Sequence, residues 1–333
     1  MTHEQEFFER LQAVVGRPGP ARVAKDPITE PAIRIWCEAV DDWNPAYQDP
    51  QWAQASRWGG IIAPATTLNM WTLPGNRRMH EAGEPLDQIN EVLFSGGFTS
   101  VAAVNNDQDY LRPLRPGDRL RQTQHIGMVT PEKQTALGVG HFLDLVSDYH
   151  TLEGEPVGRV TLRMLRWNPD TSPAVPPTNA TPDDLPEALT GPTRPPRRVD
   201  VLPSEAVTKG EHLAPWAIPV TQSSIAALAT ATYDFNDVHL DRDAAIRRGA
   251  KDVYMNILGS SGLVNCFVTD WAGPEAEVRS LRLRLRKQNH PGDTLLLSGE
   301  VTEVDDATVT VQVVGRNSLG DHLIADVQLQ LPW

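Results

Sequence analysis

Two short stretches of this 333-residue chain repeat one pattern of carboxylate, amide and ring-bearing side chains. Residues 42–49 read Asp-Trp-Asn-Pro-Ala-Tyr-Gln-Asp, and residues 234–241 read Asp-Phe-Asn-Asp-Val-His-Leu-Asp. Only the second copy places an imidazole, His239, five positions after its first carboxylate, Asp234. A carboxylate and an imidazole on one turn-rich segment can act together as acid and base on a single water molecule. The repeat therefore indicates a duplicated unit in which one copy has kept acid–base chemistry.

The repeat continues downstream of both phrases. The tripeptide Pro-Gly-Asp, a turn signal, occurs at residues 116–118 and again at 291–293. In both places a segment with alternating apolar residues follows, at 120–129 and at 295–304, and this is the period of a half-buried strand. The first copy is longer between phrase and turn, and we place its extra residues at 74–94, which is rich in turn formers.

Helical patterns accompany each phrase. Apolar residues recur at helical spacing just before it, at 31–40 and 221–232, and a short helical stretch ending at a glycine follows it. In the second copy a longer segment, 255–271, is apolar or small on nearly every side, and a helix without a polar face is a buried one. Further strand patterns follow at 278–286, 308–316 and 323–330. Each half is therefore predicted to be one buried helix followed by an antiparallel sheet that wraps it, an α+β fold.

The two copies are separated by a stretch that is dense in proline and poor in apolar periodicity. We therefore predict an extended linker at 169–198, an N-terminal domain at 1–168 and a C-terminal domain at 199–333. The chain is long enough for two such domains, each with its own core.

Composition limits the partners. The formal net charge of −13 argues against nucleic acid, because neutralising phosphates takes clustered cations. No apolar run is long enough to span a bilayer, and the N-terminus is acidic, unlike a secretory signal. Two cysteines, Cys37 and Cys266, are too few for a disulfide framework or a four-cysteine zinc site. We expect a cytoplasmic protein that contacts neither nucleic acid nor membrane.

The order of elements, together with the Asp-x-Asn-x-x-His phrase, resembles the hotdog fold of the MaoC-like, (R)-specific enoyl-CoA hydratases. Two fused copies resemble the double-hotdog members of that family over nearly the whole chain except the linker. The segments Asp-Val-His-Leu-Asp-Arg-Asp-Ala-Ala and Val-Thr-Asp-Trp-Ala-Gly further resemble the catalytic subunit of actinobacterial hydratases that shorten steroid side chains. The segments Trp-Thr-Leu-Pro-Gly and Gly-Phe-Thr-Ser-Val resemble the partner subunit of those enzymes.

The resemblance implies an enzyme that adds water to a trans-2-enoyl-CoA, the reverse of 3-hydroxyacyl-CoA dehydration, with a bulky steroid-derived acyl group as the expected substrate. Coenzyme A enters only as part of this substrate, and no metal or redox cofactor is expected. A double hotdog can pair further, so a homodimer is compatible with the sequence. The partner subunit normally continues into a zinc-ribbon and OB-fold module that recruits an aldolase. The sequence has no counterpart of that module, which leaves association with an aldolase or thiolase open.

Hydration needs a base for the water, an acid for Cα and donors for the enolate-like oxygen. Asp234 and His239 are the predicted acid–base pair, and Asn236 is predicted to orient the base or the water through its amide. The family uses a backbone N–H at the start of the central helix for the thioester oxygen, and the aligned donor here is that of Asn256. The simpler alternatives are that Asp234 caps a helix, that His239 is an ordinary half-buried imidazole and that the Asn256 N–H only starts a helix.

The first copy lacks both the acid–base histidine and the backbone N–H for the thioester oxygen. Tyr47 replaces the histidine and is a poor acid–base group near neutral pH, and Pro64, at the aligned oxyanion position, has no N–H to donate. We instead predict that this half holds the acyl group through Trp43, Tyr47, Met70 and Trp71. The alternative is that these side chains belong to an ordinary apolar core.

Residues 279–287 alternate arginine and leucine, which places the cations on one face of a strand. We predict that Arg284 and Arg286 contact the phosphates of coenzyme A. The alternative is a solvated strand face without a ligand.

Two other functions stay open on this sequence. One is a hotdog acyl-CoA thioesterase, which typically uses a carboxylate without the paired histidine. The other is a non-catalytic acyl-binding or scaffold subunit, as the first copy would be alone.

Overall fold

The computed structural model describes residues 3–76, 83–172 and 189–332. Its N-terminal helices are α1 (His3–Gln12), α2 (Glu30–Val40), α3 (Pro45–Gln48), α4 (Pro50–Ala55), the 3₁₀ turns η1 (Ala65–Thr67) and η2 (Met70–Thr72), α5 (Pro85–Ser95) and η3 (Pro169–Thr171). Its C-terminal helices are η5 (Ser204–Ala206), α6 (Gln222–Ala231), η6 (Asp237–His239), α7 (Arg242–Arg247) and α8 (Ile257–Ala272). The strands are β1 (Arg22–Val23), β2 (Ser100–Tyr110), β3 (Leu120–Val129), β4 (Lys133–Thr135), β5 (Gly138–Thr151), β6 (Pro156–Trp167), β7 (His212–Pro219), β8 (Glu277–Leu285), β9 (Thr294–Asp305), β10 (Thr308–Asn317) and β11 (Gly320–Gln330).

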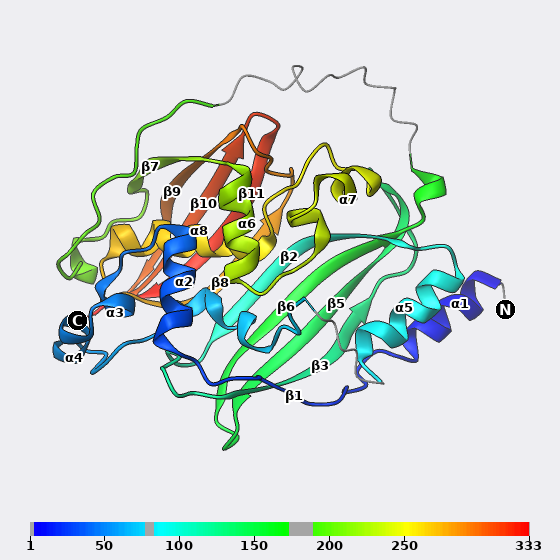
Figure 1. Ribbon diagram of the computed structural model, residues 1–333, viewed down its shortest axis with the longest axis horizontal. Coiled ribbons are helices and arrows are strands. Elements are labelled where there is room, and N and C mark those ends of the chain that lie inside the picture. The colour runs from blue at the N-terminus through cyan, green and yellow to red at the C-terminus, as the bar shows by residue number, and fades with distance from the viewer. Residues whose placement is uncertain (1–2, 77–82, 173–188, 333) are drawn as a thin grey trace.

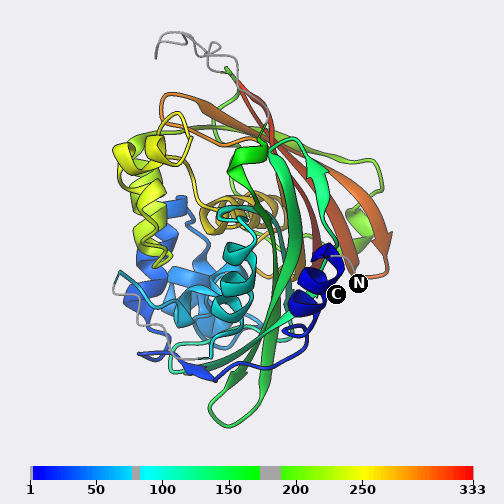
Figure 2. The same cartoon turned by 90° about the vertical axis from the view of Figure 1, so that its right-hand side faces the viewer.

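The strands form one 11-stranded antiparallel sheet, in the order β1-β3-β5-β6-β2-β8-β11-β10-β9-β7 with β4 on β5 (Figure 1). The order of strands in the first half is repeated in reverse in the second, and β2 and β8 join the halves edge to edge. Two like units that share a sheet in this way make a double hotdog. The predicted fold class is confirmed. Figure 2 shows the helices drawn in cyan and yellow, which include α5 and α7, on one side of this sheet.

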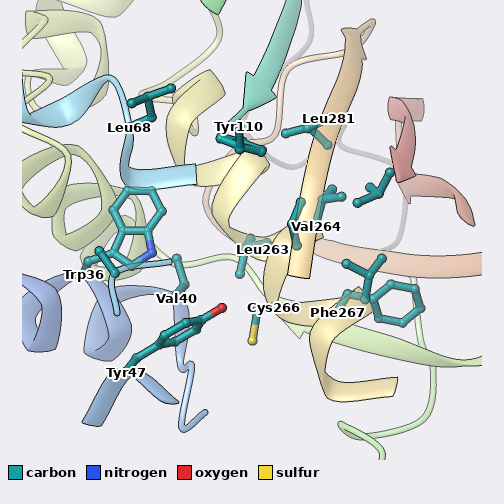
Figure 3. Packing of buried hydrophobic residues seen from close by; sticks show 14 of the residues in the cluster. Trp36, Val40, Tyr47, Leu68, Tyr110, Leu263, Val264, Cys266, Phe267 and Leu281 are labelled. Atoms are coloured by element: carbon teal, nitrogen blue, oxygen red, sulfur yellow. The ribbon is translucent and has the colours of Figure 1, made fainter. Parts of the chain in front are cut away.

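Helix α8 is the buried central helix of the second half. Every residue from Leu258 to Asp270 is buried, which matches its lack of a polar face in the sequence. Gly262 lets helix α2 come close, because a Cβ atom there would lie 2.7 Å from Cζ2 of Trp36. Figure 3 shows Phe267 of α8 inside the same apolar cluster as Trp36 and Leu281. The predicted helix at 255–271 is confirmed.

The residues that the structure describes in the first half form no such helix, and the expectation of one buried helix in each half is wrong for them. The segment that follows Pro64 makes only η1 and η2. Threonine and asparagine are frequent in it, and their side chains compete with helical backbone hydrogen bonds. Thr67, for example, donates its hydroxyl to the Pro64 carbonyl at 2.7 Å. The inner face of this sheet is therefore covered by turns where the second half has a helix.

The extra residues of the first copy contain helix α5, which packs against α1 and β3. Together these elements enclose a second, smaller apolar cluster around Leu11, Ile89, Leu93 and Ile126. The sheet of the first half is therefore covered by two separate apolar clusters, one at each end of its strands.

The end of the predicted linker is anchored between the halves by two arginines. Arg197 pairs with the buried Asp42 at 2.7 Å and also with Asp270 of α8. Arg194 contacts Asp270 at 2.6 Å and Asp41 at 2.9 Å. Burial raises the pKa of Asp270 to about 6 even beside these cations. The sequence predicted a surface connector here, and its described end instead reaches into a buried ion-pair cluster.

Among the residues that the structure describes, no helix is both long and apolar enough to cross a membrane.

Candidate active site

The acid–base pair lies in the turns between α6 and α7. A capping box at Thr221 starts α6, and Tyr233 adopts a positive φ of 58° where that helix ends. The chain then turns so that Asp234 and the η6 residue His239 face each other. Their closest atoms, Nε2 of His239 and Oδ2 of Asp234, are 3.6 Å apart. The two side chains that the sequence singled out therefore lie next to each other.

The backbone fixes which nitrogen of His239 faces the carboxylate. Nδ1 lies 2.7 Å from the Tyr254 carbonyl oxygen, so Nδ1 carries the hydrogen and Nε2 is left as an acceptor in the neutral ring. A separation of 3.6 Å is too long for a direct hydrogen bond. Nε2 of His239 and Oδ2 of Asp234 are then two acceptors that can each take one hydrogen of a shared water molecule.

Asn256 positions this carboxylate and starts α8 with the same side chain. Its amide nitrogen donates to Asp234 Oδ2 at 3.2 Å and to the Thr232 hydroxyl at 2.9 Å. Its amide oxygen accepts the backbone N–H of Gly259 at 2.9 Å, as an N-cap does. The sequence pointed to the backbone N–H of Asn256 and missed its side chain. The available signal was an asparagine just before a helix, which is an N-cap with a spare amide donor.

The backbone N–H of Asn256 lies at the N-terminus of α8, where backbone donors have no helical acceptor. Within the described chain this N–H makes no hydrogen bond. Met255, the residue before it, donates its own N–H to the Asn289 carbonyl at 3.0 Å. The first turn of α8 therefore offers free donors next to the acid–base pair.

Asn236 lies beside the pair without bonding to it. Its amide oxygen accepts a hydrogen bond from Arg248 at 3.5 Å, and Arg248 also pairs with Asp237 at 2.9 Å. The sequence predicted that the Asn236 amide orients the base or the water; the side-chain amide that bonds to Asp234 in this structure is that of Asn256.

The equivalent positions of the first copy are structural. Asp42 accepts the Asn44 N–H at 3.1 Å and holds Arg197, and Asn44 caps α3. Tyr47 is buried, and burial raises its pKa further above neutrality. Pro64 precedes η1 without an N–H.

Only part of the predicted acyl-binding group lies in the interior. Tyr47 lines a cavity of about 30 Å³ together with Leu68 and Tyr110, and Met70 belongs to the main apolar cluster. Trp71 packs against that cluster and donates its indole N–H to Thr67 at 3.3 Å. Trp43 is 59% exposed and donates to Asp41, so the structure places it on the surface.

The arginines of β8 lie on the face of the sheet turned away from α8. Leu281 and Leu283 point into the core, and Arg284 alternates with them and is exposed. Arg284 therefore lies on the opposite face of the sheet from α8 and the acid–base pair. Arg286 follows the strand and is exposed, with its N–H bonded to the His322 carbonyl at 2.8 Å. The structure favours the solvated strand face for Arg284.

One group of side chains has the composition of a metal site. Oxygen and sulfur atoms of Asp42, Cys266 and Asp270 lie within 4.8 Å of one another. The guanidinium groups of Arg194 and Arg197 already contact both carboxylates and the thiol, so cations of the protein itself neutralise this cluster.

Comparisons with known proteins agree with this architecture. A family model described as FAS1-like, dehydratase domain region, matches residues 13–160. The chain is 53% identical over 107 residues to the 3-oxo-4,17-pregnadiene-20-carboxyl-CoA hydratase beta subunit of Mycobacterium tuberculosis, across 32% of this chain and 83% of that one. It is 34% identical over 190 residues to the alpha subunit of the same name and organism, across 57% of this chain and 58% of that one. The chain thus spans just over half the length of that alpha subunit.

Solved structures show the same fold. A MaoC-like dehydratase superposes with a TM-score of 0.72 at 19% identity, over 97% of this chain and 100% of that one. A conserved hypothetical protein of Mycobacterium tuberculosis with a double hotdog fold superposes with a TM-score of 0.60 at 14% identity, over 96% and 98% of the two chains.

The fold defines a double-hotdog protein. The chain belongs to the family of the 3-oxo-4,17-pregnadiene-20-carboxyl-CoA hydratase beta subunit, and it has the fold of the MaoC-like dehydratases. The predicted family is confirmed.

Proposed function

We propose that this chain hydrates a trans-2-enoyl-CoA with Asp234 and His239 as its acid–base pair. The observation that carries the proposal is the 3.6 Å separation between Nε2 of His239 and Oδ2 of Asp234, which suits one shared water molecule. The pair removes one proton from this water as its oxygen bonds to Cβ of the substrate. It returns one proton to Cα, so that the pair ends as it began.

The start of α8 supplies the electrostatic part of the reaction. Negative charge develops on the thioester oxygen when water adds to Cβ, and free backbone N–H groups at a helix N-terminus stabilise such charge. The Asn256 N–H lies next to the side chain that positions Asp234. Asn256 therefore contributes to both parts of the reaction: its backbone N–H stabilises the charge, and its side chain positions the proton-transfer group Asp234.

The expected substrate has a bulky acyl group of steroid type. In the described part of the first half, the 3₁₀ turns η1 and η2 occupy the place that the central helix has in the second half. The relatives that match this chain are named for a 3-oxo-4,17-pregnadiene-20-carboxyl-CoA, which is a thioester on a fused-ring body. Both features support a substrate whose acyl group extends into the first half.

The proposed partners are the acyl-CoA itself and a second copy of this chain. Two relatives are named as the beta and alpha subunits of a hydratase, which supports assembly with a further chain. Association with an aldolase or thiolase is a separate proposal. Both cysteines are free and buried, which suits the proposed cytoplasmic location, where thiols stay reduced.

The function is tested by turnover of the purified chain on trans-2-enoyl-CoAs graded from four carbons to a steroid side chain. We expect loss of the conjugated double bond without release of free thiol, with the highest kcat/KM on bulky acyl groups. Release of free coenzyme A without hydration would identify a thioesterase. Absence of turnover across the whole series would identify a non-catalytic subunit.

A further inference from the structure

The inner face of the shared sheet carries buried polar residues among apolar ones in the first half, at positions that are apolar in the second half. One row of the first half runs from Gln124 on β3 through Ser147 and Val160 to Gln108 on β2. The equivalent row of the second half consists only of apolar residues and one glycine, in the order Gly299, Val313, Ala325 and Leu283. The fold therefore does not require polar residues at these positions, because the second half is built without them.

The polar residues nearest α8 keep hydrogen-bonding atoms without partners. Gln108 is 0% exposed, and its amide oxygen accepts the Tyr110 hydroxyl at 3.0 Å. Its amide nitrogen has no partner anywhere in the described chain. Asn106 is 1% exposed and donates to the Ser261 hydroxyl of α8 at 3.3 Å, while its amide oxygen is unpaired. We call Asn106, Gln108 and Ser261 the polar seam, since they lie where β2 of the first half meets α8 of the second.

Unpaired buried groups of this kind are costly. A donor or acceptor that loses water and gains no partner costs about 1–3 kcal/mol. The second half avoids this cost with Leu281 and Leu283, which lie opposite Gln108 and Asn106 on the adjoining strand. An oxygen atom of a ligand would accept from the Gln108 amide nitrogen, and a hydroxyl would also donate to Asn106.

The polar seam lies at a defined distance from the acid–base pair. Ser261 comes five residues after Asn256 on α8, which at 1.5 Å per residue is about 7.5 Å along the helix. Gln108 lies two residues beyond Asn106 on β2, or about 6.5 Å further. The unpaired atoms are thus within about 14 Å of the oxyanion donor. A substituent at the far end of a fused-ring acyl group lies at this range from its thioester carbonyl.

We infer that the polar seam binds a carbonyl or hydroxyl oxygen at the end of the acyl group distant from the thioester, with the Gln108 amide nitrogen as donor. The inference rests on the proposed function for the position of the thioester. The cavity bordered by Tyr110 and Tyr47 measures about 30 Å³, so binding also requires the turns at 65–72 to move aside. The substrate class is therefore an oxygenated, polycyclic enoyl-CoA, and a plain hydrocarbon acyl group lacks this contact.

The test measures binding without turnover. Two saturated acyl-CoAs share one fused-ring body, and one carries a ketone on the distal ring where the other has a methylene. Calorimetric titration of the wild-type chain is expected to give a Kd about 10- to 100-fold lower for the ketone. Equal affinities would overturn the inference. Because neither ligand can be hydrated, this outcome is independent of whether the chain is a hydratase.

A double variant removes the donor without leaving a new unpaired group. Gln108→Met with Tyr110→Phe deletes the amide and the hydroxyl that bonds to it, and we expect equal affinity for the two ligands with the affinity for the methylene ligand unchanged. Gln312→Met is the matched control, because Gln312 bonds to Asp326 on the exposed face of β10, and it should keep the ketone preference. If the double variant melts early, Gln108→Leu copies the residue that the second half uses. A folded variant of either kind that still prefers the ketone would refute the seam as the binding site.

Discussion

At the scale of single residues, the acid–base pair depends on a third side chain that anchors both a helix and a carboxylate. Asn256 caps α8 through its amide oxygen and donates to Asp234 through its amide nitrogen. His239 is held in the same way by the Tyr254 carbonyl. Neither Asp234 nor His239 relies on the other for its orientation, so both stay in place when water or substrate lies between them.

The two roles of Asn256 can be separated by substitution. Asn256→Ala should lower the free energy of unfolding by about 1 kcal/mol through loss of the cap, and lower kcat by roughly 10- to 100-fold as Asp234 shifts. Asn256→Ser keeps a capping oxygen but loses the amide donor. It should melt like the wild type and turn over like Asn256→Ala. Normal turnover by the serine variant would show that the amide does not position Asp234.

At the scale of elements, the long patterned segments were predictable and the interrupted ones were not. The strand at 120–129 alternates apolar and polar residues, and the helix near 255–271 is a long, unbroken apolar run. The segment after Pro64 has the same place in the repeat, but its threonines and asparagine end each helical turn. A repeat shows that two segments were once alike, and the residues present decide what each one forms now.

In the candidate site, too, some residues were predictable from the sequence and others were not. Asp234 and His239 were predictable because a repeat with one altered copy marks them. The Asn256 amide and the two linker arginines were not, because each acts on a partner that is distant in sequence. Arg197, for instance, meets a carboxylate 155 positions away.

Helix α8 also contains a buried histidine contact that makes stability depend on pH. His322 lies against the Ser260 hydroxyl at 2.9 Å, and burial lowers its pKa from 6.5 to about 4. Below about pH 6.5, His322 is protonated in the unfolded chain but stays neutral in the folded chain. The free energy of unfolding therefore falls as the pH falls from about 6.5 to about 4. The loss attributable to His322 is about 2 kcal/mol at about pH 4.5.

This loss is measured by urea unfolding at about pH 7 and about pH 4.5. His322→Gln keeps a hydrogen-bonding partner for Ser260 and cannot titrate, so its stability should fall less between the two pH values. Other titrating groups act equally in both proteins. An identical fall in both would contradict a lowered pKa for His322.

At the scale of the whole molecule, the halves are joined by a shared sheet and by the arginines at the end of the linker. Arg197 bridges Asp42 of the first half and Asp270 of the second. Removing one member of a buried ion-pair network leaves uncompensated charge, so Arg197→Met should lower the free energy of unfolding by about 3 kcal/mol. Arg316→Met breaks a pair with Asp321 whose arginine is 66% exposed, and should cost less than about 1 kcal/mol. Equal costs in chemical denaturation would show that the linker does not lock the halves.

The two halves of the duplication differ in the elements that they keep. The second half keeps the helix, its cap and the acid–base pair, while the first keeps the sheet and has turns in place of a central helix. We propose that the second half carries the acid–base chemistry and that the first half binds the acyl group. If this is so, replacing His239 slows the hydration step, and replacing the aligned Tyr47 leaves the rate of that step nearly unchanged.

The most direct test is the single-turnover rate of hydration by His239→Gln and by Tyr47→Phe on the same enoyl-CoA. We predict a loss of about 10²- to 10⁴-fold for His239→Gln with an unchanged melting temperature, and a change within about twofold for Tyr47→Phe. Near-normal hydration by folded His239→Gln, or an equally large loss in Tyr47→Phe, would contradict the account.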